Sequence, residues 1–234
     1  IPEGREYAVY VVVRRIINGL TYRYVERMDS RNLSLKNGEP DVVKAFFMDS
    51  GLSYNGNNTD PTVSIRLTGG INWAYPEQLT CTKTGQAFST NDVGKQIQIE
   101  ITGQNDPLRL NIISFVSTYV VKVAPLGTVP NQFRDQPITK YAVAVSRLTG
   151  LSHLEGKTVS VLGDGNVLPQ VVVSGGAITV SQTCAYLSAG LPYLPQIETL
   201  EVTVASQGQA SLLSSRKLIT SLIVLVEESR GIWA

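Results

Sequence analysis

The sequence contains one histidine, His153, among its 234 residues. Imidazole is the usual base of a Ser-His-Asp triad and a common zinc ligand, so every histidine-based site would depend on this one side chain. His153 stands between Ser152 and Leu154, in a stretch that reads as a tight loop before a strand. We expect it to pack or to form a backbone hydrogen bond. The chain is therefore expected to be no enzyme, with no catalytic residue, no metal and no cofactor.

Cysteine and charge are also scarce. The two cysteines, Cys81 and Cys184, lie far apart in the sequence, which argues against a disulfide scaffold and predicts two buried, reduced thiols. Charged residues make up 17% of the chain, below the roughly 25% of an average globular protein. The net charge of +1 excludes a global field that would recruit nucleic acid or an anionic membrane.

Long hydrophobic runs are missing as well. The longest, Tyr7 to Val13, has the length of a strand, and no run is long enough for a membrane-spanning helix. We expect no membrane segment. The chain begins with Ile1 rather than methionine and ends with the apolar residues Ile232 to Ala234, so we expect a fragment of a longer polypeptide.

β-branched residues and turn signals are abundant. Asn18-Gly19 separates the runs Tyr7 to Ile17 and Leu20 to Met28, which predicts a β-hairpin with a type I′ turn. Because the first run is almost continuously hydrophobic, we expect this strand to be buried on both faces.

The remaining sequence predicts short strands between turns. Ser89 or Asn91 is expected to cap one helical turn, and Gly208 to Arg216 is the one candidate helix. Regular short strands without repeated helices indicate an all-β sandwich or barrel. Expected strands include Val42 to Met48, the alternating Gln96 to Ile101, Ile138 to Val145 (a strand or a short helix), Thr158 to Leu162, Val171 to Val173, Ile178 to Val180, Ala185 to Ala189 and Leu218 to Glu227.

Two loop patterns resemble ligand sites only in part. Gly163-Asp164-Gly165 lacks the Lys-Ser/Thr of a Walker motif and the third glycine of a dinucleotide fingerprint, so we interpret it as a hairpin turn. Five aspartates in loops lack the spacing of a calcium loop, although an isolated surface cation stays an alternative. These are Asp41, Asp49, Asp60, Asp106 and Asp135.

The hairpin carries the clearest group of basic and aromatic residues. We favour a solvated face in which the arginines pair with Glu26 and Asp29. The alternative is that they line a channel or contact phosphates. The tyrosines indicate packing rather than base stacking, since no aromatic RNA-binding pattern surrounds them. The residues are Arg14, Arg15, Arg23, Arg27, Tyr10, Tyr22 and Tyr24.

Several segments, in their order and spacing, resemble one family, the tail nozzle or tail tubular B-type proteins of short-tailed bacteriophages and prophages. Members of that family are longer than this chain, are β-rich with propeller-like parts, and are not enzymes. The resembling segments are 12–19, 24–27, 46–54, 153–159, 172–179, 190–193 and 229–231.

The resemblance implies a virion structural protein at the distal end of the tail tube. Its implied partners are other phage tail proteins and further copies in a homo-oligomeric ring of the full-length protein. It also implies a transient contact with exiting DNA, no membrane partner, synthesis in the bacterial host cytoplasm and a final place in the virion tail.

A middle segment is similar to a second module. Phe88 and Asp92 to Lys95 stand before an alternating strand, as in the small β-barrel named after the first catalytic-cysteine half-domain (FCCH) of ubiquitin-activating enzyme. That similarity concerns the fold and implies no ubiquitin chemistry. We therefore expect a discontinuous sandwich- or barrel-like β domain formed by residues 1–60 and 148–234, with an inserted small β-barrel domain at 61–147.

The alternative function is a carbohydrate- or host-receptor-binding module. Its candidate platform is a set of three aromatic residues in the insert, Trp73, Tyr75 and Tyr119. Exposed rings on one face would favour this alternative, and a flat contact surface would favour the ring component.

Overall fold

The computed structural model describes residues 2–3, 6–7, 9–17, 19–28, 35–36, 39–45, 48–85, 87–104 and 106–192. Residues 1–192 form one unit and residues 193–234 a second, so all the described residues belong to the first. The expected helix Gly208 to Arg216 and the expected strand Leu218 to Glu227 lie outside the described residues.

The described chain is all-β, as the sequence predicted. Its helical segments are 3-10 turns of three residues, and its paired strands run antiparallel. The larger sheet has eight strands in the order β13-β8-β9-β12-β11-β10-β14-β17. These are β8 (Ile65–Thr68), β9 (Leu79–Lys83), β10 (Gln96–Ile99), β11 (Leu108–Ser117), β12 (Val120–Pro125), β13 (Pro137–Ile138), β14 (Tyr141–Thr149) and β17 (Ala177–Cys184).

One hydrophobic core is formed by this sheet. Buried residues alternate with partly or fully exposed ones along β8 and β9, because successive side chains of a strand point to opposite faces. The expected alternation fails in β10, where Gln96 and Gln98 are buried together with Ile97 and Ile99. The glutamines tolerate burial because they are hydrogen-bonded: Gln96 Nε2 donates to Asn111 Oδ1 (3.0 Å) and Gln98 Nε2 to the carbonyl of Thr183 (3.4 Å).

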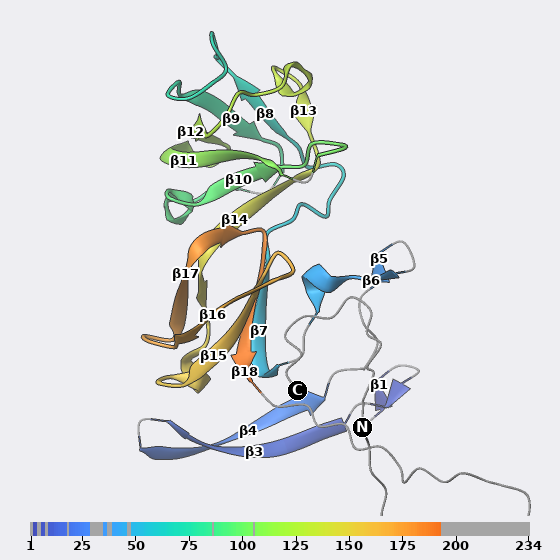
Figure 1. Ribbon diagram of the computed structural model, residues 1–234, viewed down its shortest axis with the longest axis vertical. Helices are drawn as coiled ribbons and strands as arrows, with labels where there is room; N and C mark the ends of the chain where they lie inside the picture. The colour runs from blue at the N-terminus through green and yellow to red at the C-terminus, as the bar shows by residue number, and fades with distance from the viewer. Residues whose placement is uncertain are drawn as a thin grey trace, which may run out of the picture. The chain divides into compact units, whose positions relative to one another are not determined.

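A second core belongs to a four-stranded sheet in the order β16-β15-β18-β7. Val159, Val161 and Leu187 from this sheet pack in one cluster with Val145 and Leu148 of β14. Figure 1 shows β14 running from the strands of the first core to those of the second. The strands of the smaller sheet are β7 (Asp49–Asn55), β15 (Thr158–Gly163), β16 (Asn166–Val172) and β18 (Tyr186–Leu191).

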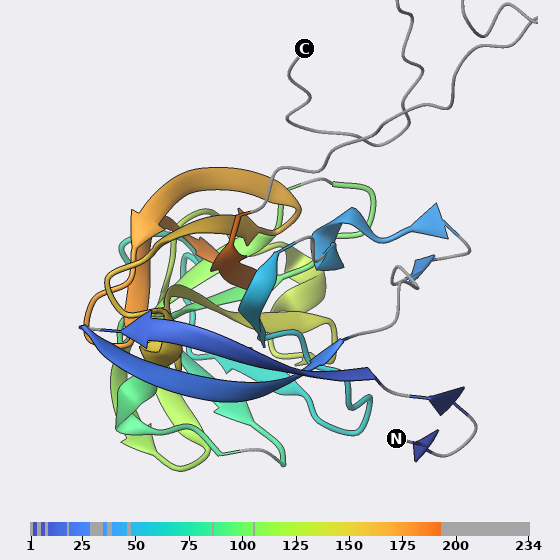
Figure 2. The same cartoon turned by 90° about the horizontal axis from the view of Figure 1, so that it is seen from below.

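The predicted hairpin is present. Strands β3 (Val9–Ile17) and β4 (Leu20–Met28) pair from Val9↔Met28 to Ile17↔Leu20, and Figure 2 shows them as a long ribbon. Gly19 has φ +79°, the sign that a type I′ turn requires, while Asn18 lies outside the described residues.

The expectation that the first strand is buried on both faces is wrong. Val12 is 69% exposed and Ile16 is 53% exposed. The β3–β4 sheet has only two strands, so one of its faces lacks a covering layer within the described part of the chain. Hydrophobic content predicted the strand correctly but did not predict what covers it.

The expected strand at Val42 to Met48 is also wrong. A 3-10 turn, η1 (Val42–Lys44), stands there, and β7 begins only at Asp49. The carbonyl of Asp41 accepts from Lys44 N (3.1 Å), and its carboxylate accepts from Val43 N (3.3 Å). These local bonds compete with strand formation. Just before this turn, β5 (Leu35–Lys36) and β6 (Glu39–Pro40) pair with each other.

Other local predictions are confirmed. Ser89 is the N-cap of η2 (Thr90–Asp92), and its backbone N donates to the Asp92 carboxylate (2.7 Å). Ile138 ends β13 and Tyr141 to Val145 belong to β14, so this segment contributes strand rather than helix. The described residues contain no helix long and apolar enough to cross a membrane. The proposed domain boundaries at 60/61 and 147/148 stay a prediction, and β14 runs through the second of them.

Candidate functional site

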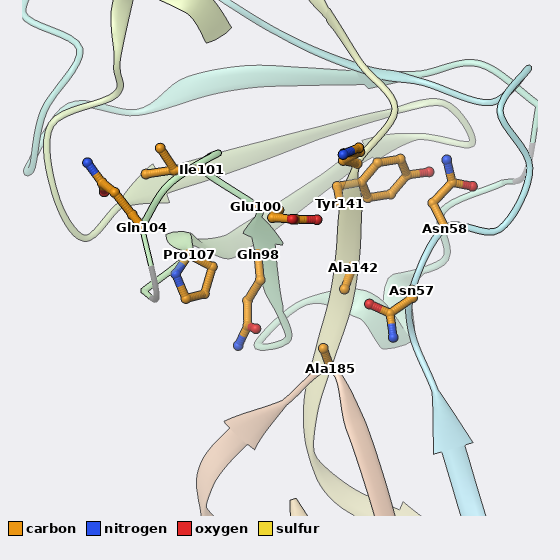
Figure 3. A pocket seen from close by; sticks show the side chains of 11 residues that line it. Asn57, Asn58, Gln98, Glu100, Ile101, Gln104, Pro107, Tyr141, Ala142 and Ala185 are labelled. Carbon is orange, nitrogen blue, oxygen red and sulfur yellow. The ribbon is translucent and has the colours of Figure 1, made fainter. Parts of the chain in front are cut away.

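A polar cavity of about 350 Å³ lies where the two cores meet (Figure 3). Its walls come mainly from three separate stretches: the segment after β7, the region from β10 to Pro107, and the start of β14. The side chains with useful polar groups are Asn57, Gln98, Glu100, Gln104, Lys140 and Tyr141.

The wall after β7 is fixed to β14 by hydrogen bonds. Asn58 N donates to the carbonyl of Tyr141 (2.8 Å), and Val143 N donates to the carbonyl of Gly56 (2.9 Å). The Asn58 amide group also donates to the carbonyls of Val63 and Thr139, each at 2.8 Å. Hydrogen bonds within the protein therefore fix the backbone that bounds the cavity on this side.

The chemistry of the cavity is that of a neutral polar site. Glu100 and Lys140 supply one charge of each sign, and Gln98 and Gln104 supply amides. Burial raises the pKa of Tyr141 to about 12, so its hydroxyl keeps its proton at neutral pH. Such groups can orient a neutral hydroxylated ligand, and none of them is paired with a base that would activate it as a nucleophile.

No pattern in the sequence signals this cavity. Its residues are separated by up to 128 positions, from Asn57 to Ala185, and only strand register brings them together. The described residues contain no group of three or more histidine, cysteine, aspartate or glutamate side chains able to hold a metal ion.

His153 makes the backbone hydrogen bond that was expected of it. It follows Ser152 in η4 (Ser152–Leu154), and its Nε2 donates to the carbonyl of Ser50 on β7 (2.7 Å). Its ring lies 6.1 Å from that of Tyr24, centroid to centroid. The hydroxyl of Ser50 donates instead to Glu26 Oε1 (2.8 Å), so the imidazole is not placed as the base of this serine.

Asp164 belongs to a hairpin turn, as predicted. Gly163 pairs with Asn166, and the two residues between them have φ of +48° and +77°. The Asp164 carboxylate accepts from Tyr186 N (2.8 Å) and Ala185 N (3.1 Å), which joins the turn to β18. Its oxygens thus bind the protein's own backbone.

Within the described residues, none of the five loop aspartates belongs to a group of three or more acidic, histidine or cysteine side chains able to hold a metal, and the isolated surface cation stays an untested alternative. Asp41 pairs with Lys44 (3.4 Å), and Asp60 accepts from the hydroxyl of Thr62 (2.6 Å). That hydroxyl and the Thr62 backbone lower the pKa of Asp60. Asp49, Asp106 and Asp135 lie in separate segments of the chain.

The expected aromatic platform of Trp73, Tyr75 and Tyr119 is not formed. Trp73 is 6% exposed and belongs to the first core, whereas Tyr75 is 68% and Tyr119 is 51% exposed. The Glu77 carboxylate explains the difference, because it accepts the backbone N–H groups of three consecutive residues, Ile71 to Trp73. This local fold directs the indole of Trp73 into the core, where Arg134 Cζ lies 5.6 Å from the centre of the ring.

The hairpin arginines have different surroundings. Arg15 pairs with Glu26 (2.7 Å) and also donates to the hydroxyl of Ser50. Arg14 stands directly opposite Arg23 in the register, and both are exposed. The expected pairing with Glu26 is thus confirmed for Arg15, while Asp29 lies outside the described residues. Tyr10 and Tyr22 are exposed, and Tyr24 packs beside His153.

The chain matches no protein-family model, and no curated protein is significantly similar to it in sequence.

Proposed function

We propose that the chain is part of a structural component of a bacteriophage or prophage tail, a nozzle- or hub-type protein at the distal end of the tail tube. In this role it contacts other tail proteins and further copies of itself in a ring, and meets DNA transiently as the DNA leaves. The protein is made in the host cytoplasm and functions in the virion tail. It acts through its shape and surfaces rather than through catalysis.

The observation that carries the proposal is the path of β14. Tyr141, at its start, packs in the first core, and Val145 and Leu148 pack in the second. Domains joined by a flexible linker move relative to one another by default. A strand hydrogen-bonded to β10 at one end and to β17 at the other replaces such a linker. This supports a stiff body, as a subunit of a tube or ring requires.

Exposed apolar side chains supply surfaces for neighbours. Val167 and Val172, near the two ends of β16, are 66% and 54% exposed, and β16 is the last strand of its sheet. An edge strand with apolar side chains favours pairing with another chain.

The test is immunogold electron microscopy of virions whose genome encodes this chain, with antibodies against the 234-residue protein. Label at the distal tail tip is the expected result. Virions of normal composition that carry no label would contradict the proposal, and label on the capsid alone would place the protein elsewhere.

The second candidate is a carbohydrate- or host-receptor-binding module, which the polar cavity favours. Amide groups and a protonated tyrosine are suited to sugar hydroxyls. Glycan-array binding that is lost in Gln104→Ala, a cavity variant, would support it. The control is Gln132→Ala, because Gln132 lies in η3 (Asn131–Phe133) and outside the cavity wall.

A further inference from the structure

The outer face of the β3–β4 hairpin has an unusual composition. Residues directly opposite in an antiparallel pair share a face, and alternate residues of a strand share it too. The register therefore places Arg14 and Arg23 on one face with Val12 and Val25. All eight residues of this outer face are exposed: Tyr10, Val12, Arg14, Ile16, Thr21, Arg23, Val25 and Arg27.

Charge is divided unequally between the two faces of the hairpin. Glu26 is the only acidic residue of the two strands, and it lies opposite Val11 on the inner face. There it pairs with Arg15 at 2.7 Å. The outer face consequently carries three arginines and no carboxylate.

Arg14 and Arg23 form a directly opposed pair of basic residues on this face. Like charges directly opposite one another destabilise an antiparallel pair. Within the described residues, neither guanidinium has a hydrogen-bond or ion-pair partner that would relieve the repulsion. A bound anion would relieve it, since two guanidiniums side by side can bind phosphate oxygens with charge-assisted hydrogen bonds.

The inner face fixes the hairpin to the second core. Glu26 accepts from Arg15 and from Ser50 of β7, and Tyr24 packs beside His153 of η4. On the same face Ile17 is buried and Val13 is partly buried. These inner-face contacts hold the hairpin so that its outer face points away from the second core.

We propose that this outer face binds duplex DNA, with the two-stranded ribbon in the major groove and Arg14 and Arg23 on the phosphates. A two-stranded β-ribbon fits this groove, and aliphatic side chains such as Val12 and Val25 can contact thymine methyl groups. This inference specifies which surface makes the transient DNA contact of the proposed function, and to that extent it rests on the proposed function. The surface itself is assigned by the hairpin's own register and charges.

The test is fluorescence anisotropy of a labelled duplex of about two helical turns, with the full chain, between about 50 and 200 mM salt. We expect salt-dependent binding that weakens about tenfold or more in the double variant Arg14→Glu/Arg23→Glu. The slope of log K against log salt should fall by about 2, because two phosphates are then no longer neutralised. The matched control is Arg109→Glu/Arg147→Glu, which changes the net charge equally at two exposed arginines of the larger sheet.

Each outcome decides the inference. No binding at the lowest salt, or equal losses in the two double variants, would overturn it. Polyglutamate that competes as well as unlabelled duplex at equal charge would indicate an acidic protein partner instead and would also overturn it. Circular dichroism of both variants checks their folding. Virion labelling is a separate measurement, so a tail protein without DNA binding would refute this inference and leave the proposed function standing.

Discussion

At the residue scale, several ionisable groups are buried against neighbours that determine their chemistry. Lys83 Nζ lies 5.2 Å from the Phe88 ring centre and 5.6 Å from that of Tyr141. Desolvation lowers the pKa of this lysine, and the two rings offer cation–π contacts to its charged form. Cys81, two residues earlier on the same face of β9, is fully buried. The interior of the first core thus holds a cation and a thiol that solvent hardly reaches.

The two thiols should be unreactive in the folded protein. Burial raises the pKa of Cys81 to about 12 and that of Cys184 to about 11, so little thiolate exists at neutral pH. We expect negligible reaction of the native chain with Ellman's reagent at about pH 8 and reaction of both cysteines in guanidinium. Fast reaction of one thiol per native chain would show that one of the cores is open to solvent.

The Glu77 carboxylate should make the Ile71–Trp73 segment sensitive to acid. Hydrogen bonds from the backbone of Ile71, Trp73 and Asn72 lower its pKa below the ordinary value of 4.5, despite some opposing desolvation. A lowered carboxyl pKa contributes stability that is complete above the ordinary value and is lost as the pH falls through the folded-state value. Glu77→Gln should therefore lower the melting temperature at about pH 7, and its difference from wild type should shrink toward about pH 3.

A matched variant separates this effect from the loss of a charge. Glu100→Gln removes an exposed carboxylate that makes no side-chain hydrogen bond in the described part of the chain, so it should leave the melting temperature nearly unchanged. A difference between Glu77→Gln and wild type that stays constant with pH would contradict the assigned role of the carboxylate.

At the element scale, the β3–β4 hairpin has two unlike faces. Its inner face joins β7 and η4 through Arg15, Glu26 and Tyr24, and its outer face presents exposed aliphatic and basic side chains. An isolated two-stranded hairpin is marginally stable in water. The inner contacts and the turn therefore determine whether this element is formed.

Gly19 should be required for the turn. Its φ of +79° is unfavourable for other residues and strongly so for β-branched ones, while a Cβ there would meet no atom within 4 Å. Gly19→Val should destabilise the hairpin by about 1 kcal/mol or more, purely through backbone strain. Amide hydrogen exchange of β3 and β4 measures this local opening.

The control is Gly127→Val. Gly127 also has open space around its Cβ position but does not have the positive φ of Gly19. Hydrogen exchange in the hairpin should be unchanged in this variant. Equal protection of β3 and β4 in Gly19→Val and wild type would contradict the turn assignment.

At the scale of the whole molecule, β14 couples the two cores. It is the partner of β10 through Tyr141 to Ala144 and of β17 from Val145 onward. The segment after β7 lies beside the residues that precede β14. The Asn58 amide group donates to the carbonyl of Asp60 within this segment (3.0 Å) and to that of Thr139, just before β14 (2.8 Å). The chain thus enters and leaves the strands of the first core at neighbouring points.

Two deletions should behave differently. Removing residues 61–140 and joining Asp60 to Tyr141 through a short Gly/Ser linker keeps β14, so the second core should still fold. Removing residues 61–148 also takes away Val145 and Leu148, two buried members of that core, and leaves β17 without its neighbour. We expect well-dispersed amide resonances in NMR spectra of the 61–140 deletion and poorly dispersed ones, typical of an unfolded chain, for the 61–148 deletion. Two folded products would show that β14 is dispensable to the second core.

The sequence by itself determined the all-β class, the hairpin between Ile17 and Leu20, the turn at Asp164 and a helical turn capped by Ser89 or Asn91, of which the structure shows Ser89. Each of these depends on backbone preferences or hydrogen bonds within a few residues. Only the tertiary structure decided that the first strand of the hairpin is exposed, that Trp73 is buried and that β14 serves two cores. The polar cavity belongs with these, because its walls meet through strand pairing between distant segments. Side-chain periodicity specifies that a strand has two faces, whereas burial depends on which other strands or loops reach them.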